Sequence, residues 1–214
     1  MPSRDLRSRV VRRANRLGLD PSVGLLTQIE LYFDLLKKWN QRINLTALPL
    51  DPLSDETIDR LVIEPLVAAR YVREEDRLCI DVGSGGGSPG IPFLLARPEL
   101  RLVLVEVKVR KSAFLREVVR QLALEQVQVE NRRFEELLAR SDLLEAADLV
   151  TIRAVRPDTR LWNTIQAFLR PGGRVFWFGA SGAARLVQPP LLVEDRRVAL
   201  VPSLGSELVI LIKT

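Results

Sequence analysis

The stretch that decides the fold is Asp81-Val82-Gly83-Ser84-Gly85-Gly86-Gly87, which directly follows the apolar run Leu78-Cys79-Ile80. An apolar run that ends in an acidic residue and alternating glycines is typical of the turn between a parallel strand and a helix. Without side chains the turn lets backbone approach a ligand closely, and the free N–H groups of the next helix point toward that ligand. The stretch therefore predicts a nucleotide-like cofactor at this turn.

The spacing of the glycines narrows the kind of cofactor. A dinucleotide-binding turn follows G-x-G-x-x-G, which would require a glycine at position 88, where the chain has Ser88. A phosphate-binding loop would end in Gly-Lys-Ser or Gly-Lys-Thr, and neither tripeptide occurs in the sequence. The remaining pattern, D-x-G-x-G-x-G, is typical of methyltransferases that use S-adenosylmethionine (AdoMet), a cofactor without phosphates. A purely structural glycine turn is the alternative that the motif alone leaves open.

From residue 78 onward, short β-rich runs alternate with helical stretches. We expect strands at 78–82, 101–106, 126–130, 148–152 and 173–178, and helices at 90–97, 109–123, 134–145 and 160–169. Strands separated by helices predict a parallel sheet with helices on both faces. The last two apolar runs, 191–201 and 207–213, are joined by a connection of hairpin length and predict an antiparallel pair. The pattern indicates an α/β, doubly wound class I AdoMet-dependent methyltransferase fold.

The first 75 residues have a different pattern, which predicts a small N-terminal helical cap. Apolar residues recur at helical spacing from Ser22 to Arg42 and from Asp55, a candidate N-cap, to Tyr71. Residues 1–20 are a short basic helix or a loosely held arm, whose arginines we expect to supply diffuse charge: Arg4, Arg7, Arg9, Arg12, Arg13 and Arg16. We expect two parts, a cap with a basic arm at 1–75 and a methyltransferase domain at 76–214.

Composition excludes several kinds of chemistry. The chain of 214 residues has no histidine, which removes a histidine base, histidine metal ligands and a Ser-His-Asp triad. Its single cysteine, Cys79, excludes a disulfide framework and a cysteine metal cluster, so no metal is expected. The 32 Lys plus Arg against 27 Asp plus Glu suit a nucleic-acid partner, with an ordinary soluble surface as the alternative. No apolar run is long enough to span a membrane, and we expect a cytoplasmic protein.

In this fold a ligand lies beyond the carboxyl ends of the strands. Glu106 ends the second expected strand, where its carboxylate could accept hydrogen bonds from both ribose hydroxyls of AdoMet. After the third strand, the turn that contains Phe134 opens a helix whose backbone N–H could meet adenine, or is an ordinary charged N-terminal turn. Arg153 follows the fourth strand, where the methyl acceptor should lie, or merely pairs with a carboxylate at the strand end.

The residues after the fourth strand indicate the acceptor. The Asn/Asp-Pro-Pro-aromatic motif of enzymes that methylate exocyclic amines is absent there. Carbon-5 pyrimidine methylation needs a cysteine nucleophile, and Cys79 lies inside the first strand. Guanine N7 suits a site rich in arginine, since its lone pair lies in the ring plane with no proton to remove. Transfer to N7 needs alignment and electrostatics and no general base.

Several segments together resemble one family, the bacterial 16S rRNA guanine-N7 methyltransferases. They are W-N-Q-R-I-N-L-T-A at 39–47, D-V-G-S-G-G-G-S-P-G-I-P at 81–92, Glu106 with Arg110-Lys111 and Phe114-Leu115, Arg133-Phe134-Glu135, Arg153-Ala154-Val155 and L-R-P-G-G at 169–173. The resemblance implies an AdoMet-dependent monomer that methylates a guanine in small-subunit rRNA or a small-subunit particle, with no membrane partner and with a cap that assists RNA recognition.

With the reading of the strand ends, this resemblance gives three sets of candidate site residues. For the cofactor they are Asp81, Gly83, Ser84, Gly85, Gly87, Glu106, Phe134 and Glu135; for RNA they are Asn44, Arg110, Lys111, Arg133 and Arg153; Arg153 is also the candidate catalytic residue. The sequence departs from the family pattern at Leu61, Ser88 and Phe178, where a histidine, an aromatic residue and a lysine are usual. A relative with another RNA or a small molecule as substrate, and a non-catalytic RNA-binding module, remain the alternatives.

Overall fold

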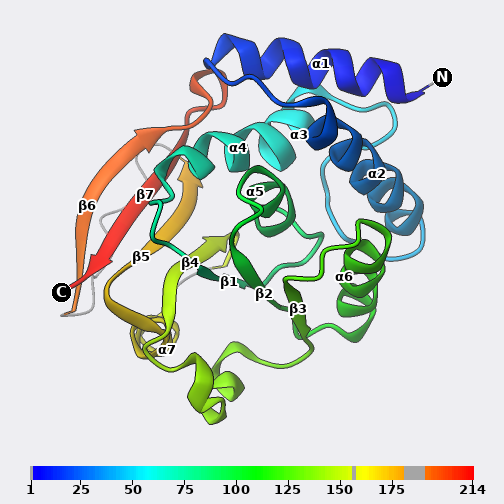
Figure 1. The fold of residues 1–214 in the computed structure, drawn as a ribbon. Helices are drawn as coiled ribbons and strands as arrows, with labels where there is room; N and C mark the ends of the chain where they lie inside the picture. Colours follow the sequence, from blue (N-terminus) through cyan, green and yellow to red (C-terminus); the bar gives the residue numbers. More distant parts are fainter. Residues whose placement is uncertain (1, 156–157, 181–190) are drawn as a thin grey trace.

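A seven-stranded sheet forms the centre of the molecule (Figure 1). The computed structural model describes residues 2–155, 158–180 and 191–214. The strand order is β3-β2-β1-β4-β5-β7-β6; the pairs from β3 to β5 are parallel, and β7 runs antiparallel to both β5 and β6. The strands are β1 Leu78–Val82, β2 Arg101–Val105, β3 Val127–Glu130, β4 Ala147–Arg153, β5 Leu169–Ala180, β6 Leu192–Ala199 and β7 Ser206–Lys213. All seven expected strands are confirmed, and so is the antiparallel pair.

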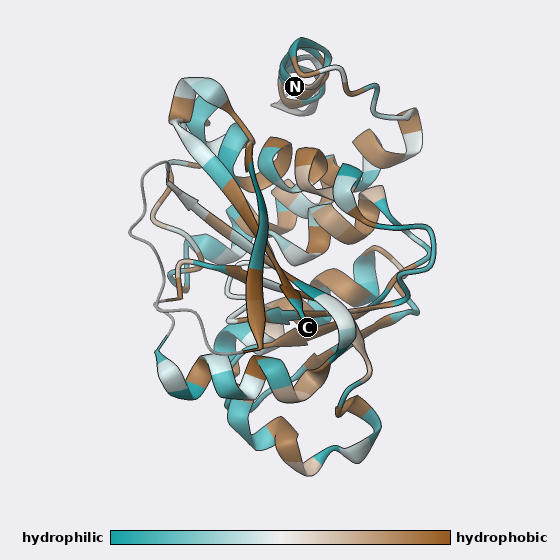
Figure 2. Ribbon diagram, turned by 90° about the vertical axis from the view of Figure 1, so that its left-hand side faces the viewer, coloured by the Kyte–Doolittle hydropathy of each residue, from teal (hydrophilic) through white to brown (hydrophobic). Residues whose placement is uncertain are grey.

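Helices cover both faces of this sheet. They are α1 Pro2–Arg16, α2 Val23–Asn40, α3 Asp55–Ile58, α4 Glu64–Ala68, α5 Gly90–Ala96, α6 Val109–Gln121 and α7 Thr159–Phe168. Alternate residues of β1 point to opposite faces, so Cys79 joins the core under α1, α2, α4, α5 and α6, whereas Ile80 joins the core under α7. Figure 2 shows the hydrophobic stretches gathered in the central strands and in the helices stacked beside them. Within the described ranges, no helix is long and apolar enough to cross a membrane.

Two expected helices differ from the structure. The segment expected to be helical at 134–145 forms only two short 3-10 helices, Phe134–Ala139 and Ser141–Leu143. The helix expected over 55–71 is interrupted by a π-helical turn, Asp59–Ile63, and closes with a 3-10 turn, Ala69–Tyr71. Its N-cap is Ser54, whose hydroxyl accepts from Thr57 N at 3.0 Å, and the expectation that Asp55 caps it was wrong.

The basic N-terminal segment is a helix that packs on the cap, and three of its arginines are engaged within the protein. Arg7 pairs with Glu30 on α2 at 2.5 Å, Arg9 pairs with Asp55, and Arg13 pairs with Asp59, whose side chain is 2% exposed. The expectation that Arg7, Arg9 and Arg13 supply only diffuse charge was therefore wrong, because each is held by an acid of the cap.

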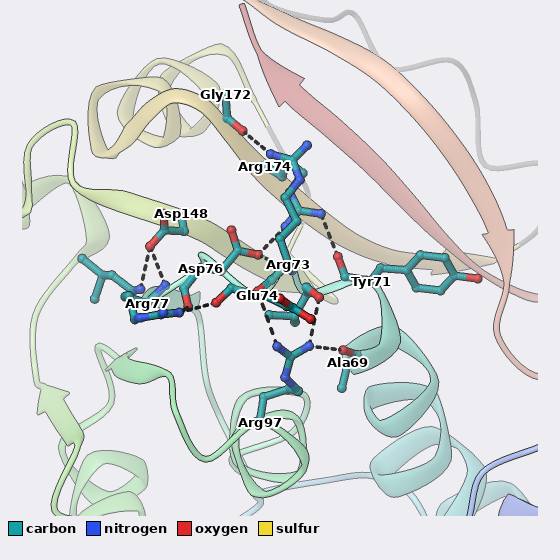
Figure 3. A network of polar contacts seen from close by, with 12 residues as sticks. Ala69, Tyr71, Arg73, Glu74, Asp76, Arg77, Arg97, Asp148, Gly172 and Arg174 are labelled. Carbon is teal, nitrogen blue, oxygen red and sulfur yellow. Dashed lines mark hydrogen bonds and ion pairs between the residues drawn. The ribbon is translucent and has the colours of Figure 1, made fainter.

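A network of charged side chains joins the cap to the amino end of the sheet (Figure 3). Asp148 at the start of β4 accepts from the backbone N–H groups of Arg77 and Leu78, both at 2.8 Å. Arg174 on β5 pairs with buried Asp76 and donates to the Tyr71 carbonyl at 2.7 Å. Figure 3 shows Arg73 and Arg97 reaching into the same network from either side. We name these contacts the amino-end network; they tie the last turn of the cap to three strands.

Candidate functional site

Two hollows lie at the carboxyl ends of the parallel strands, on either side of the glycine loop. The first, about 500 Å³, lies between the cap and the loop, and the second, about 420 Å³, lies between β2 and the 3-10 turn at 134–139. Gly83, Glu106 and Val155 line both hollows, so the two meet at the loop. The first is lined by Leu36, Leu45–Leu48, Arg60, Leu61, Gly83–Gly86, Ser88, Glu106, Lys111 and Arg153–Val155; the second by Val82, Gly83, Val105–Lys108, Arg132–Glu135, Val155, Asp158 and Leu161.

The glycine loop has a backbone that side chains would not allow. Gly83 and Gly87 have φ values of +71° and +89°, in the left-handed region that favours glycine. A Cβ on Gly83 would lie 2.9 Å from Val155 Cγ2, and one on Gly87 would lie 3.1 Å from Ile91 Cγ1. The backbone at Gly83 therefore approaches the meeting point of the two hollows with nothing between.

Glu106 holds this loop from the end of β2. One carboxylate oxygen accepts from Gly85 N at 2.9 Å, and the other accepts from Lys108 N at 2.7 Å. Its residue is 6% exposed, and it borders both hollows. Each carboxylate oxygen has two lone pairs, so Glu106 can still accept hydrogen bonds from two hydroxyls.

Asp81 lies behind the loop and lines neither hollow. Its residue is 1% exposed, and one oxygen accepts from the Thr151 hydroxyl at 2.5 Å while the other has no partner. Burial raises the pKa of this carboxyl, and the Thr151 and Ser84 hydroxyls only partly oppose that effect. Ser84 donates to the Asp81 carbonyl at 3.0 Å, so this pair braces the start of the loop.

The turn after β3 forms the far wall of the second hollow. Phe134 and Glu135, the candidates for the cofactor, line it together with Arg133, the candidate for RNA, and the segment is a 3-10 turn. The ring of Phe134 packs against Phe168 on α7, with the centroids 5.1 Å apart. Glu136 accepts from Arg133 N at 3.0 Å, and this bond fixes the first turn.

Arg153, the last residue of β4, sits between the glycine loop and the π-helical turn of the cap. Its terminal nitrogens donate to the Arg60 carbonyl and to the Ser88 hydroxyl, and Glu64 Oε2 lies 3.3 Å away. Ser88 in turn donates to the Leu61 carbonyl at 2.8 Å. Burial lowers the pKa of Arg153, an effect that Glu64 opposes, while burial raises the pKa of Glu64. Arg153 thus pairs with a carboxylate of the cap helix α4, and it also lines the first hollow.

The three departures from the family pattern meet around this arginine. The Leu61 carbonyl and the Ser88 hydroxyl belong to its hydrogen-bonded chain, and the Phe178 ring lies 5.8 Å from the guanidinium carbon. Positions that are far apart in the sequence thus form one cluster, which borders the first hollow.

The cap also holds the loop through residues that sequence reasoning missed. Tyr32 on α2 donates its hydroxyl to the Gly86 carbonyl at 2.6 Å, and burial raises its pKa. The Asn40 side chain accepts from Leu45 N at 2.8 Å and Thr46 N at 3.0 Å, which sets that segment against the glycine loop. Asn40 lies in the segment 39–47, whose resemblance to the family could have pointed to it. No feature of the sequence pointed to Tyr32.

The remaining candidates for RNA lie on the rim. Asn44 is exposed, Lys111 lines the first hollow, and Arg110 lines a third hollow of about 270 Å³ beside it. Arg156 and Pro157, which follow the fourth strand, lie outside the described residues. In the described part of the chain, no group of acidic or cysteine side chains could hold a metal ion.

Comparison with known proteins gives consistent matches. Residues 25–187 match the family model described as rRNA small subunit methyltransferase G. A relative from Neisseria gonorrhoeae, named Ribosomal RNA small subunit methyltransferase G, is 34% identical over 203 residues, which cover 91% of this chain and 92% of that protein.

Solved structures resemble the fold at lower identity. A mutant of MtNAS in complex with S-adenosylmethionine has a TM-score of 0.57 at 16% identity, covering 97% of each chain. A SAM-dependent methyltransferase from Aquifex aeolicus has a TM-score of 0.57 at 14% identity, covering 77% of this chain and 96% of that one. The expected fold class, a class I methyltransferase sheet with helices at the N-terminus, is confirmed.

Proposed function

This chain belongs to the rRNA small subunit methyltransferase G family, and from that premise we propose that it transfers a methyl group from AdoMet to N7 of a guanine in small-subunit rRNA. The observation that carries the proposal is the meeting of two hollows at Gly83 and Glu106. One hollow can take a nucleoside beside the carboxylate of Glu106, and the other can take an acceptor base under the cap.

The residues at this junction fit AdoMet. Glu106 has lone pairs left for the two ribose hydroxyls, and the second hollow offers the Phe134 side chain and the backbone of the 3-10 turn to an adenine ring. The backbone of Gly83 and Gly85 faces the first hollow without side chains in the way. We propose Ser84 and Gly87 as members of this cofactor site through the loop, and Asp81 as its brace from behind.

Bound AdoMet supplies an electrophilic methyl group, so the protein's task is alignment. Guanine N7 carries a lone pair and no proton, and the transfer therefore requires no general base. Among the described residues, Thr46 and Arg60 line the first hollow on the cap side and Lys111 lines it on the α6 side, while Asn44 lies on its rim. We propose Arg153 as a positioning residue, because its terminal nitrogens are engaged with Arg60 and Ser88 and hold the cap against the loop.

We also propose the finer points that follow from this substrate. A protein that acts on ribosomal RNA works in the cytoplasm, and a single chain contains both hollows, which supports a monomer. We also propose the division into a cap at 1–75 and a methyltransferase domain at 76–214. Residues of both parts belong to one hydrophobic core, so the division is one of role and not of separate folding units.

The test is methyl transfer by the purified protein. Unmodified small-subunit rRNA and small-subunit particles would be incubated with AdoMet carrying a labelled methyl group, and digested nucleosides would be identified by mass spectrometry. The proposal expects label in 7-methylguanosine. Label in another nucleoside or in no nucleoside, with AdoMet bound normally in calorimetry, would favour the relative with another substrate or the non-catalytic module.

The assignment of Glu106 has its own test. Glu106→Ala removes an acceptor of charge-assisted hydrogen bonds and should weaken AdoMet binding by about 1 to 3 kcal/mol. Glu117→Ala, an equal change of charge on α6 beyond the two hollows, is the control and should bind AdoMet as the wild type does. Equal affinity of Glu106→Ala and wild type would remove the ribose assignment.

A further inference from the structure

A third hollow, about 270 Å³, is lined by residues at and just after the end of α2 and at the start of α6. Its lining combines one aromatic ring with three cations: Trp39 with Lys38, Arg42 and Arg110, completed by Ile43 and Ala113. The indole of Trp39 packs against Phe114, with ring centroids 5.8 Å apart and an angle of 60°. The ring is therefore held by the core while it borders the hollow.

The cations of this hollow differ from most arginines of the molecule. In the part of the chain that the structure describes, neither Arg42 nor Arg110 forms an ion pair or a side-chain hydrogen bond, and both are exposed. Lys38 is exposed as well. Its positive charge contributes to the lowered pKa of Glu117 on α6, although the two side chains form no ion pair. These two guanidinium groups, which line the same hollow as the ring, therefore remain available to an anionic ligand.

The third hollow and the first are lined by residues that are near neighbours in the sequence. Ile43 lines the third and Leu45 lines the first, so the exposed Asn44 lies on the ridge between them. On the other side, Arg110 lines the third hollow and its neighbour Lys111 lines the first. A strand that leaves the first hollow across this ridge can therefore enter the third, since successive parts of the chain line one hollow and then the other.

We propose that the third hollow binds a single-stranded nucleotide that flanks the target guanine, with its phosphate between Arg42 and Arg110 and its base against Trp39. This inference rests on the proposed function, because it takes the first hollow as the site of the target base. Guanidinium groups bind phosphate through paired hydrogen bonds, and bases of every kind stack on aromatic rings. Proteins that bind unpaired strands commonly combine cations with an aromatic ring in this way.

The first experiment measures affinity for an unmodified small-subunit rRNA transcript by filter binding over a range of KCl concentrations. The double variant Arg42→Gln/Arg110→Gln removes the contact with one phosphate, so it should lower the slope of log affinity on log salt by about one unit and weaken binding about fivefold near physiological salt. The matched control, Arg12→Gln/Arg16→Gln, removes the same charge from exposed positions on α1. It should change the affinity less than about twofold.

The second experiment addresses the ring. RNA binding should quench tryptophan emission of the wild type, and most of that quenching should be absent from Trp39→Phe, which keeps an aromatic ring against Phe114. Trp39→Ala, which removes the ring, should bind the transcript less tightly, within the range of about 5- to 150-fold expected for lost base stacking, whereas Trp39→Phe should stay closer to wild type. Circular dichroism checks that each variant is folded.

The outcomes separate this inference from the proposed function. If wild type methylates the transcript while the Arg42/Arg110 variant binds it with unchanged slope, the flanking subsite is wrong and the proposed function stands. If both double variants lost RNA affinity equally, the RNA would be attracted by diffuse positive charge and not by this hollow, which would also overturn the subsite. If wild type transfers no methyl group to any RNA, the proposed function itself fails. Unchanged quenching in Trp39→Phe would exclude the contact between base and indole.

Discussion

The two ends of the sheet use arginine in opposite ways. At the amino end, Arg97 and Arg174 donate to backbone carbonyls, and Arg174 also pairs with buried Asp76 (Figure 3). At the carboxyl end, Arg42 and Arg110 border a hollow and form no ion pair among the described residues. The same side chain therefore stabilises the fold at one end and remains available to a ligand at the other. The net charge of the chain does not show which arginines stabilise the fold and which remain available to a ligand. The contacts of each guanidinium group show this.

Replacing Arg174 tests most directly whether arginines at the amino end stabilise the fold. Arg174→Met leaves the Asp76 carboxylate, whose residue is 1% exposed, without its closest cation. Breaking a buried ion pair on one side costs about 3 to 5 kcal/mol, and we expect a loss of that size in the free energy of unfolding in urea. The control is Arg196→Met, an exposed position on β6, with an expected change within about 0.5 kcal/mol. A stable Arg174→Met variant would mean that the amino-end network does not hold the fold.

Arg153 stands between the two classes, since it is paired like the amino-end arginines but borders the first hollow. Arg153→Ala removes hydrogen bonds from a charged group to Ser88 and the Arg60 carbonyl, and we expect a loss of about 2 kcal/mol in unfolding free energy. As a positioning residue it should also lower the rate of methyl transfer at saturating RNA, while the salt slope of RNA binding stays unchanged.

Two further variants sharpen this result. Arg153→Lys keeps the charge but has one donor nitrogen in place of the two that reach Arg60 and Ser88, so it should recover part of the stability and part of the rate. Ser88→Ala removes the hydroxyl that accepts from Arg153 and donates to the Leu61 carbonyl, and it should lower the rate with a smaller loss of stability than Arg153→Ala. A lower salt slope for Arg153→Ala would instead assign Arg153 to the ligand-binding class, as a direct contact of the RNA.

The contrast between the two ends also explains what sequence reasoning could predict. The glycine loop and Glu106 were predicted because short, local sequence patterns mark them: the spacing of the glycines and the end of an apolar run. Every strand was likewise predicted from its apolar run. Which arginines are paired depends on contacts between distant segments, such as Arg13 with Asp59 or Arg174 with Asp76. No local pattern encodes those contacts.

The same reason accounts for the cluster around Arg153. Leu61, Ser88 and Phe178 were noted in the sequence as separate departures, and only the fold brings them to one guanidinium. The π-helical turn at 59–63 was also missed, because it looks like an ordinary amphipathic helix in sequence. Its Arg60 and Leu61 carbonyls are acceptors for Arg153 and Ser88, so this irregular turn is where the cap contacts the site.

At the carboxyl end, a neutral hydroxyl holds the loop where the amino end uses charges. Tyr32→Phe removes the hydrogen bond to the Gly86 carbonyl and leaves the ring in place. We expect a loss of about 1 kcal/mol, expressed chiefly in AdoMet affinity by calorimetry, because the loop is the part released. Tyr71→Phe, whose hydroxyl forms no hydrogen bond within the described chain, is the control. A loss confined to unfolding free energy would mean that Tyr32 serves the core and not the loop.

The smallest expected effect concerns pH at the amino end. Burial would raise the pKa of Asp148, but hydrogen bonds from Leu78 N, Arg170 and Arg77 N outweigh it and hold the pKa below its ordinary value. A carboxyl whose folded pKa is lowered stabilises the fold above its unfolded pKa, and that contribution is lost as the pH falls through the folded pKa. Asp148→Asn should therefore cost about 0.5 to 1 kcal/mol at neutral pH, since the Arg170 partner is a third exposed and Asn still accepts from backbone. Below about pH 4 the difference between variant and wild type should shrink toward zero in urea unfolding. A difference that persisted unchanged in acid would show that packing, and not the charge of Asp148, accounts for the cost.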